Sequence, residues 1–287
     1  MILARATDVS RRYGAVLALD HLDLDVHAGE LVGLLGPNGA GKSTLVNLLT
    51  GVRRPSTGRV ELCGGDPRDP ATRRVLGVTP QETGLPSALR VGEVVDFVRA
   101  HFPDPLGKRE LLARFGLEEL ERRQTGGLSG GQKRRVAVAL AFAGRPRIVF
   151  LDEPTTGLDV AARHALWDGV RAFHADGGTV VLTSHYLEEV EALASRVVVI
   201  DGGRVLADDT VAAVRGLVAI RRVSVTAAVP MPDLPGVVGT EREGDRTHLL
   251  TPDADRLVRD LIARDVPFRD LEVRPTSLEE AFLTLTA

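Results

Sequence analysis

Two glycine-rich loops in this 287-residue sequence have residue types and spacings that suit anion binding. The first, "GPNGAGKST", follows the apolar run "LVGLL" and fits the pattern G-x-x-x-x-G-K-[ST] at Gly36, Gly41, Lys42 and Ser43. Glycines let backbone N–H groups approach phosphate oxygens closely, and the N-terminus of the following helix adds positive charge. The loop therefore predicts a phosphate site, in which Lys42 reaches the β- and γ-phosphates and Ser43 offers its hydroxyl to Mg²⁺.

Ionisable side chains follow two further apolar runs. "RIVFL" leads into Asp152 and Glu153, and "TVVLTS" leads into His185. Ligands of open α/β sheets lie beyond the carboxyl ends of the strands, so these side chains are expected at the same edge as the phosphate loop. Adjacent residues of a strand point in different directions, so we assign Asp152 to Mg²⁺, through water, and Glu153 to polarising an attacking water. Without its context, His185 is best interpreted as a structural histidine. Only its position at a strand end favours a role in the site.

The second loop lies in "GGLSGGQKRR", which spans Gly126 to Arg135 and runs into a helical pattern. Ser129, Gly130 and Gly131 form a second glycine-rich turn at the start of a helix, and this geometry also suits an anion. The alternative is that this turn is a glycine-rich helix cap that binds no ligand. The chain contains only one such phosphate loop, which leaves open at this point which anion the second loop binds.

The elements that position these loops follow from hydrophobic patterning. Three short apolar runs, at 31–35, 147–151 and 179–184, indicate parallel strands buried on both faces. Apolar and polar residues alternate over 21–26, which indicates a strand with one solvent-exposed face. Most of 86–130 is helical and lies between two strand candidates, which predicts a helical insertion. The expected helices are at 42–51, 91–101, 107–115, 131–144, 160–175 and 186–194.

The sequence pattern changes near 215–218, where the α/β core is expected to end. The tail predicts a small α+β domain, with Thr251 and Pro252 as the cap and first residue of its first helix. We therefore expect a phosphate-binding domain over 1–217, containing a helical subdomain at about 86–144, and an accessory domain over 218–287. Its expected strands lie near 221–229, 236–241, 245–250 and 268–274, and its helices near 253–264 and 277–285.

The composition excludes several classes of protein. The formal net charge is −3, so no excess of charge points to nucleic acid. Cys63 is the single cysteine, so a disulfide within the chain is impossible and a cysteine-based metal cluster is not expected. The first residues lack the features of a signal peptide. The longest apolar run, at 136–144, falls short of the roughly 20 residues of a spanning helix, so the chain is not expected to cross a membrane alone.

Taken together, residues 5–215 resemble the ATP-binding subunits of ABC transporters. "GPNGAGKST" is similar to the family's Walker A motif, and "RIVFLDEP" is similar to its Walker B motif, with Glu153 at the catalytic glutamate. "LSGGQ", from Leu128 to Gln132, matches the signature that separates this family from other P-loop NTPases. A generic P-loop kinase or GTPase would leave that signature unexplained. The resemblance implies an α/β fold: a P-loop NTPase core of the ABC ATPase type, with a mixed sheet, a helical insertion and a small C-terminal α+β domain.

The resemblance also implies ATP and Mg²⁺ as cofactors and assigns residues to them. Gln81 falls at the family's Q-loop, Asp159 at its D-loop, which serves dimer communication, and His185 at its switch histidine. The implied catalytic residues are Glu153, His185, Gln81 and Lys42, and the implied Mg²⁺ residues are Ser43, Gln81 and Asp152. The implied ATP contacts are Tyr13, which stacks on adenine, with Gly36, Pro37, Asn38, Gly39, Ala40, Gly41, Lys42, Ser43 and Thr44, and, from a second subunit, Ser129, Gly130, Gly131 and Gln132.

The resemblance further implies a head-to-tail dimer, which accounts for the second loop. The signature of one subunit closes on the γ-phosphate held by the other, so ATP binding shifts the population towards the closed dimer. A homodimer is the expectation because all motif positions are intact. The partner beyond it is an integral membrane permease, which places the chain at the cytoplasmic side of the membrane as a peripheral subunit. No nucleic acid partner is expected.

The kind of transporter is inferred from stretches of sequence that are less specific than the motifs above. "SHYLEEVEALASRVVVIDGGRVLADDT" and "RPTSLEEAFLTLT" resemble bacterial multidrug and antibiotic exporters of the daunorubicin-resistance-like group. This implies an ATPase that powers export of a drug-like small molecule through a separate membrane protein. An importer and a lipid or polysaccharide exporter stay open as alternatives. A soluble ABC ATPase of translation or DNA repair is disfavoured, because those carry two ATPase halves or a long coiled coil.

Overall fold

The structure is a computed structural model that describes residues 1–79, 84–184, 186–217, 220–227, 231–275, 277–279 and 282. The chain divides into two compact units, Met1–Thr210 and Val211–Ala287. Each unit has its own hydrophobic core cluster, so each is described by itself.

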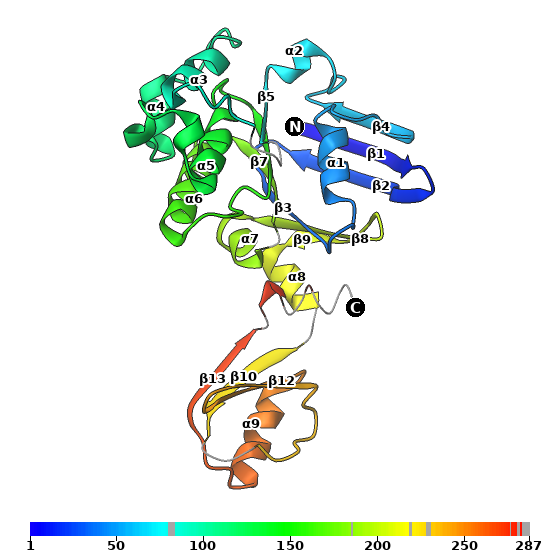
Figure 1. Cartoon of the computed structure of the whole chain (residues 1–287). Coiled ribbons are helices and arrows are strands. Elements are labelled where there is room, and N and C mark those ends of the chain that lie inside the picture. The colour runs from blue at the N-terminus through cyan, green and yellow to red at the C-terminus, as the bar shows by residue number, and fades with distance from the viewer. Residues whose placement is uncertain are drawn as a thin grey trace. The chain divides into compact units, whose positions relative to one another are not determined.

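A six-stranded sheet in the order β5-β6-β7-β3-β8-β9 forms the centre of the first unit (Figure 1). The first five strands pair in parallel and β9 pairs antiparallel with β8, which confirms the predicted mixed sheet. All residues of β3, β6 and β7 are buried, as expected for apolar runs covered on both faces. The strands are β3 (Leu31–Leu35), β5 (Leu76–Thr79), β6 (Ile148–Asp152), β7 (Thr179–Thr183), β8 (Arg196–Asp201) and β9 (Arg204–Thr210).

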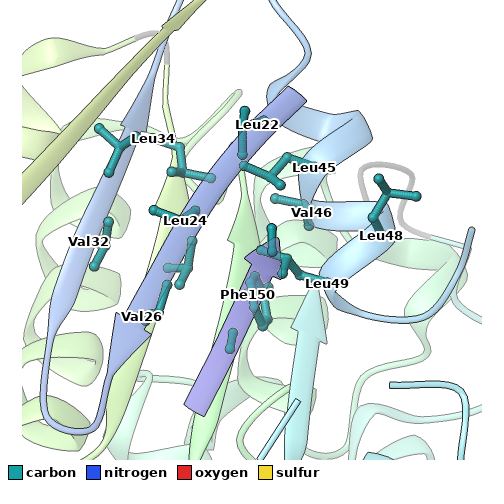
Figure 2. Close-up of a cluster of buried hydrophobic side chains, with 14 of the residues drawn as sticks. Leu22, Leu24, Val26, Val32, Leu34, Leu45, Val46, Leu48, Leu49 and Phe150 are labelled. Carbon is teal, nitrogen blue, oxygen red and sulfur yellow. The ribbon is translucent and has the colours of Figure 1, made fainter. Parts of the chain in front are cut away.

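A three-stranded antiparallel sheet, in the order β2-β1-β4, completes the strands of this unit. Its strands are β1 (Ile2–Tyr13), β2 (Val16–His27) and β4 (Thr57–Leu62). Leu22, Leu24 and Val26 are buried at every second position of β2, which confirms the predicted alternation. Figure 2 shows these side chains in one cluster with residues of β3, of β6 and of α1 (Lys42–Leu49), so the core lies between the two sheets and around this helix.

The predicted helical insertion is confirmed between β5 and β6. Figure 1 shows its helices grouped together, away from the three-stranded sheet. Its members are α3 (Val91–Arg99), α4 (Lys108–Arg114), 3₁₀ turns at Glu118–Leu120 and Thr125–Gly127, and α5 (Gly130–Leu140). The other helices of the unit are α2 (Pro70–Arg73), α6 (Val160–Ala175) and α7 (Leu187–Leu193).

The second unit is an antiparallel sheet with a helix on one face. Its sheet order is β11-β12-β10-β13, and Leu257 and Leu261 of α9 pack on Val223 and Val225 of β10. The elements are α8 (Val211–Leu217), β10 (Arg221–Thr226), β11 (Gly239–Glu243), β12 (Arg246–Thr251), α9 (Ala254–Ala263) and β13 (Arg269–Pro275).

The prediction that Thr251 caps the first helix of this unit was wrong. Thr251 is still paired with Arg221 in the sheet, and its hydroxyl accepts from the amide of Asp253 at 3.2 Å. Asp253 is the cap, and its carboxylate accepts from the amide of Arg256 at 2.9 Å. Most of the helix expected at 277–285 lies outside the described residues.

Candidate functional site

The loop after β3 leads directly into α1, with Gly41 as the N-cap residue. Gly41 has φ +107°, and a Cβ at this position would lie 2.5 Å from the carbonyl oxygen of Ala18 and 2.7 Å from Leu19 Cδ2. Only glycine fits both the conformation and the close approach of β2. None of the side chains that the structure describes caps α1, so the N–H groups of its first turn are available to an anion.

The ammonium group of Lys42 lies within this loop. Its Nζ donates to the carbonyl oxygens of Gly36 at 2.7 Å and Pro37 at 3.0 Å, and the residue is 9% exposed. Burial lowers the pKa of Lys42, an effect opposed by the nearby charges of Glu153 and Asp152. The loop therefore contains a cation whose charge faces the carboxylates at the end of β6.

Asp152 is buried at the end of β6, between hydroxyl groups. Its Oδ1 accepts a 2.5 Å hydrogen bond from the hydroxyl of Thr183 and lies 3.5 Å from the hydroxyl of Ser43. Oxygen ligands of this kind suit a hard divalent cation such as Mg²⁺. The described part of the chain contains no group of three or more His, Cys, Asp or Glu side chains that could hold a metal. Within the described part of the chain, a cation here would therefore meet one carboxylate and one hydroxyl, and its other ligands would come from outside these two groups, such as water and oxygens of a bound phosphate.

Glu153 has different partners from its neighbour. Its carboxylate accepts from the hydroxyl of Thr156 at 3.3 Å, and its amide donates to the carbonyl oxygen of Thr183 at 3.1 Å. Its φ of +49° lies in the left-handed region, which residues other than glycine rarely adopt. The side chain is partly exposed, so water can reach it.

The second glycine loop caps α5. Ser129 Oγ accepts from the amide of Gln132 at 3.2 Å, and Gln132 Oε1 accepts from the amide of Ser129 at 3.1 Å, which forms a capping box. Ser129 and Gly130 are exposed, so a second molecule can reach the loop. A Cβ on Gly131 would lie 3.1 Å from the carbonyl oxygen of Gly157. The glycine loop at Gly131 and the turn at Gly157 are therefore in close contact.

Four further predicted site residues are Asp159, Tyr13, Gln81 and His185. Asp159 caps α6, and its carboxylate accepts from the amide of Ala162 at 2.8 Å. Tyr13 ends β1 with 41% of its surface exposed, and the guanidinium of Arg11 lies 4.5 Å from its ring centroid. Gln81 and His185 lie outside the described residues.

Sequence reasoning missed three buried polar residues around the site. Thr183 is the last residue of β7, and its place at the end of an apolar run is the sequence feature that could have pointed to it. Arg134 follows the signature by two residues and lies on the buried face of α5. Glu189 is fully buried in α7, where its carboxylate accepts from Trp167 Nε1 at 3.1 Å and from the hydroxyl of Thr155 at 3.0 Å. Nothing in the local pattern distinguished Glu189 from its charged neighbours.

Comparison with known proteins identifies the family. A model described as "ABC transporter" matches residues 19–156. The daunorubicin resistance ATP-binding protein DrrA3 of Streptomyces coeruleorubidus is 39% identical, over 96% of this chain and 93% of its own length. This chain belongs to the ABC transporter family. Other relatives are a doxorubicin resistance ATP-binding protein of Mycobacterium tuberculosis (35% identity, 95% and 89% coverage) and a Nod factor export ATP-binding protein of Rhizobium sp. (35% identity, 97% and 95% coverage).

Solved structures of ABC ATPases have the same fold. An ATP-binding subunit of an ABC transporter aligns with a TM-score of 0.68 at 30% identity, covering 75% of this chain and 92% of the other. A dimeric ATP-binding cassette in a post-hydrolysis state, bound to ADP and Pi, aligns with a TM-score of 0.66 at 26% identity, covering 72% and 98%. The chain is therefore an ABC ATPase, and ATP is its nucleotide. Among the described residues, no helix is both long enough and apolar enough to span a membrane.

Proposed function

We propose that this ABC ATPase powers the export of a drug- or antibiotic-like small molecule through a separate integral membrane protein. The observation that carries the proposal is the likeness to drug-resistance ATP-binding proteins over nearly the whole chain, including the second unit. In this role the chain lies at the cytoplasmic side of the membrane, and the accessory domain expected over 218–287, which falls within the second unit, serves packing or dimer contact.

The residues at the edge of the six-stranded sheet have distinct proposed roles. Lys42 leaves its contacts with Gly36 and Pro37 and binds the β- and γ-phosphates, because a buried ammonium gains most from an anion. Glu153 orients and polarises the attacking water. Gln81 and His185 complete the catalytic set, and Tyr13 stacks on adenine once its ring is released from Arg11.

The hydroxyl of Ser43, the carboxylate of Asp152 and the side chain of Gln81 are the proposed Mg²⁺ residues. The pairing of Ser43 with Asp152 at 3.5 Å supports this assignment, because both groups are hard oxygen donors near the lysine. Mg²⁺ bound there supplies positive charge that stabilises the transferred phosphoryl group. Asp152 contributes through water, and Thr183 holds its carboxylate in orientation.

The exposed signature loop is proposed to act on the partner subunit. Ser129, Gly130, Gly131 and Gln132 bind the γ-phosphate of ATP held by a second copy, so each of the two sites needs both chains. Asp159 directly follows Gly157 and Leu158, which lie against Gly131, and it is proposed to transmit closure between the sites. ATP contacts of this kind exist only in the closed dimer, so hydrolysis opens it.

A second candidate is export of a Nod factor-like molecule, favoured by the match to the Rhizobium protein over 97% of this chain. The two candidates share the ATPase and differ in the cargo that the membrane partner binds. They are therefore separated only by an experiment that includes that partner.

The test is to isolate the membrane protein that co-purifies with the full chain and to reconstitute the pair in lipid vesicles. Drug-like compounds are expected to raise ATPase activity and to be transported, and Glu153→Gln is expected to bind ATP, trap the dimer and abolish both effects. Co-purification with ribosomes or DNA in place of a membrane protein would refute the transport role. Stimulation by Nod factor alone would favour the second candidate.

A further inference from the structure

Arg134 is a buried cation on α5 to which the roles above assign no task. Its surface is 6% exposed, and it shares a helix face with Val138, which is fully buried. Burial lowers the pKa of the Arg134 guanidinium, an effect that Asp152, Glu153 and Glu189 oppose. Because arginine stays protonated in proteins, a charge this deeply buried needs fixed partners.

Two consecutive backbone carbonyls at the end of β6 are among its partners. Nη2 of Arg134 donates to the carbonyl oxygen of Asp152 and, at 3.0 Å, to that of Glu153. Hydrogen bonds from an ionised donor are stronger than those between neutral groups. The contact therefore fixes the peptide planes on both sides of the Glu153 α-carbon.

The backbone of Glu153 has a conformation that needs such support. Its φ of +49° is sparsely populated by residues other than glycine, and such conformations persist where surrounding contacts hold them. The amide of Glu153 donates to the carbonyl oxygen and to the hydroxyl of Thr183, both at 3.1 Å. Rotation of the backbone out of this region would break contacts with Arg134, with Thr183, or with both.

We propose that Arg134 is a positioning residue for ATP hydrolysis, because its guanidinium holds the Glu153 backbone so that the carboxylate meets the attacking water. The inference rests on the proposed role of Glu153. Small misplacements of reacting groups slow catalysis strongly, whereas ATP affinity depends on the loop Gly36–Thr44. Loss of the guanidinium is therefore expected to lower kcat with little change in ATP binding.

Arg135 offers a matched control on the same helix. Its Nη2 donates to the carbonyl oxygens of Phe115 at 2.8 Å and Gly116 at 2.5 Å. The chemistry is the same, a guanidinium on two consecutive carbonyls, but these carbonyls directly follow α4 and are not at the end of β6. A substitution of Arg135 therefore measures what loss of such a contact costs the fold alone.

The experiment compares Arg134→Met, Arg134→Lys and Arg135→Met in the full chain. ATPase kinetics, equilibrium binding of a fluorescent ATP analogue and thermal melting are measured for each. Arg134→Met is expected to lower kcat by on the order of 100-fold with ATP affinity near that of the wild type. Arg134→Lys is expected to recover part of kcat, since an ammonium still donates to one carbonyl, and Arg135→Met is expected to keep kcat.

Wild-type kcat in Arg134→Met, or an equal loss in Arg135→Met, would overturn the inference. If Arg134→Met does not fold, Arg134→Lys decides: a lower kcat at an unchanged melting temperature supports a positioning role, and an unchanged kcat contradicts it. Wild-type turnover in Glu153→Gln would instead refute the role of Glu153 itself. The failures of the two proposals are thus distinguishable.

Discussion

The hydroxyl of Thr183 donates a 2.5 Å hydrogen bond to the carboxylate of Asp152, and the two residues are register partners at the ends of β7 and β6. The same hydroxyl accepts from the amide of Glu153 at 3.1 Å. The Thr183 side chain thus orients the proposed Mg²⁺ carboxylate and holds the backbone of Glu153, the residue proposed to polarise the attacking water.

Thr183→Val is expected to raise the Mg²⁺ concentration needed for half-maximal ATPase activity by about 10-fold, because groups that orient a metal ligand affect metal affinity on this scale. Valine keeps the shape of the side chain and removes only the hydroxyl. Thr183→Ser, which keeps the hydroxyl, is the control and should retain the wild-type Mg²⁺ dependence. An unchanged dependence in the valine variant would show that Asp152 does not need this bond.

Glu189 provides a prediction about pH and stability. Burial raises the pKa of Glu189 above its ordinary value of 4.5, so the neutral acid is more favoured in the folded protein than in the unfolded chain. Its contribution to stability is fully present below the unfolded pKa and is lost as the pH rises through the folded pKa. Glu189→Gln, which stays neutral, should therefore gain stability relative to the wild type as the pH rises above about 4.5.

Melting temperatures measured from pH 4 to pH 8 test this expectation. The matched control is Glu188→Gln on the same helix, since the Glu188 side chain is 76% exposed and contacts Arg163 at 3.5 Å. A difference between Glu189→Gln and the wild type that does not change with pH would contradict the assignment of a raised pKa to Glu189.

Asp159 has a structural task and a proposed functional one, which two substitutions separate. Asp159→Ala removes the cap of α6 and should cost about 1 kcal/mol of stability, whereas Asp159→Ser keeps a capping oxygen. Both variants should lower the cooperativity of ATP hydrolysis if Asp159 transmits closure. A serine variant that melts and hydrolyses like the wild type would limit Asp159 to the cap.

Ser129→Arg tests whether the site is shared between subunits. A long cation on this exposed loop should block hydrolysis and ATP-dependent dimer formation while leaving the ATP affinity of the monomer unchanged. Gly127→Arg is the control, because Gly127 is also exposed and a Cβ there meets no atom of the described residues within 4 Å. Hydrolysis that is first order in protein and unaffected by Ser129→Arg would argue against a shared site.

Sequence patterns predicted the parts of this protein whose chemistry is local. The loop from Gly36 to Thr44 is a continuous stretch, so its glycines, lysine and hydroxyl residues are visible together. The apolar runs of β3 and β7 correctly predicted strands buried on both faces, and the helix expected at 160–175 matches α6. In the second unit, local cap rules chose Thr251 because they do not include its pairing with Arg221 in the sheet.

The sequence by itself determined the nucleotide loop, the paired carboxylates and the family, since each is written in consecutive residues. Only the tertiary structure decided which distant groups hold them. β7 lies between β3 and β6 in the sheet, so Thr183 reaches Asp152 from 31 residues away, and α5 brings Arg134 to the same strand end. The physical reason is that strand order and helix packing bring such groups together, and neither is encoded in the spacing of residues along the chain.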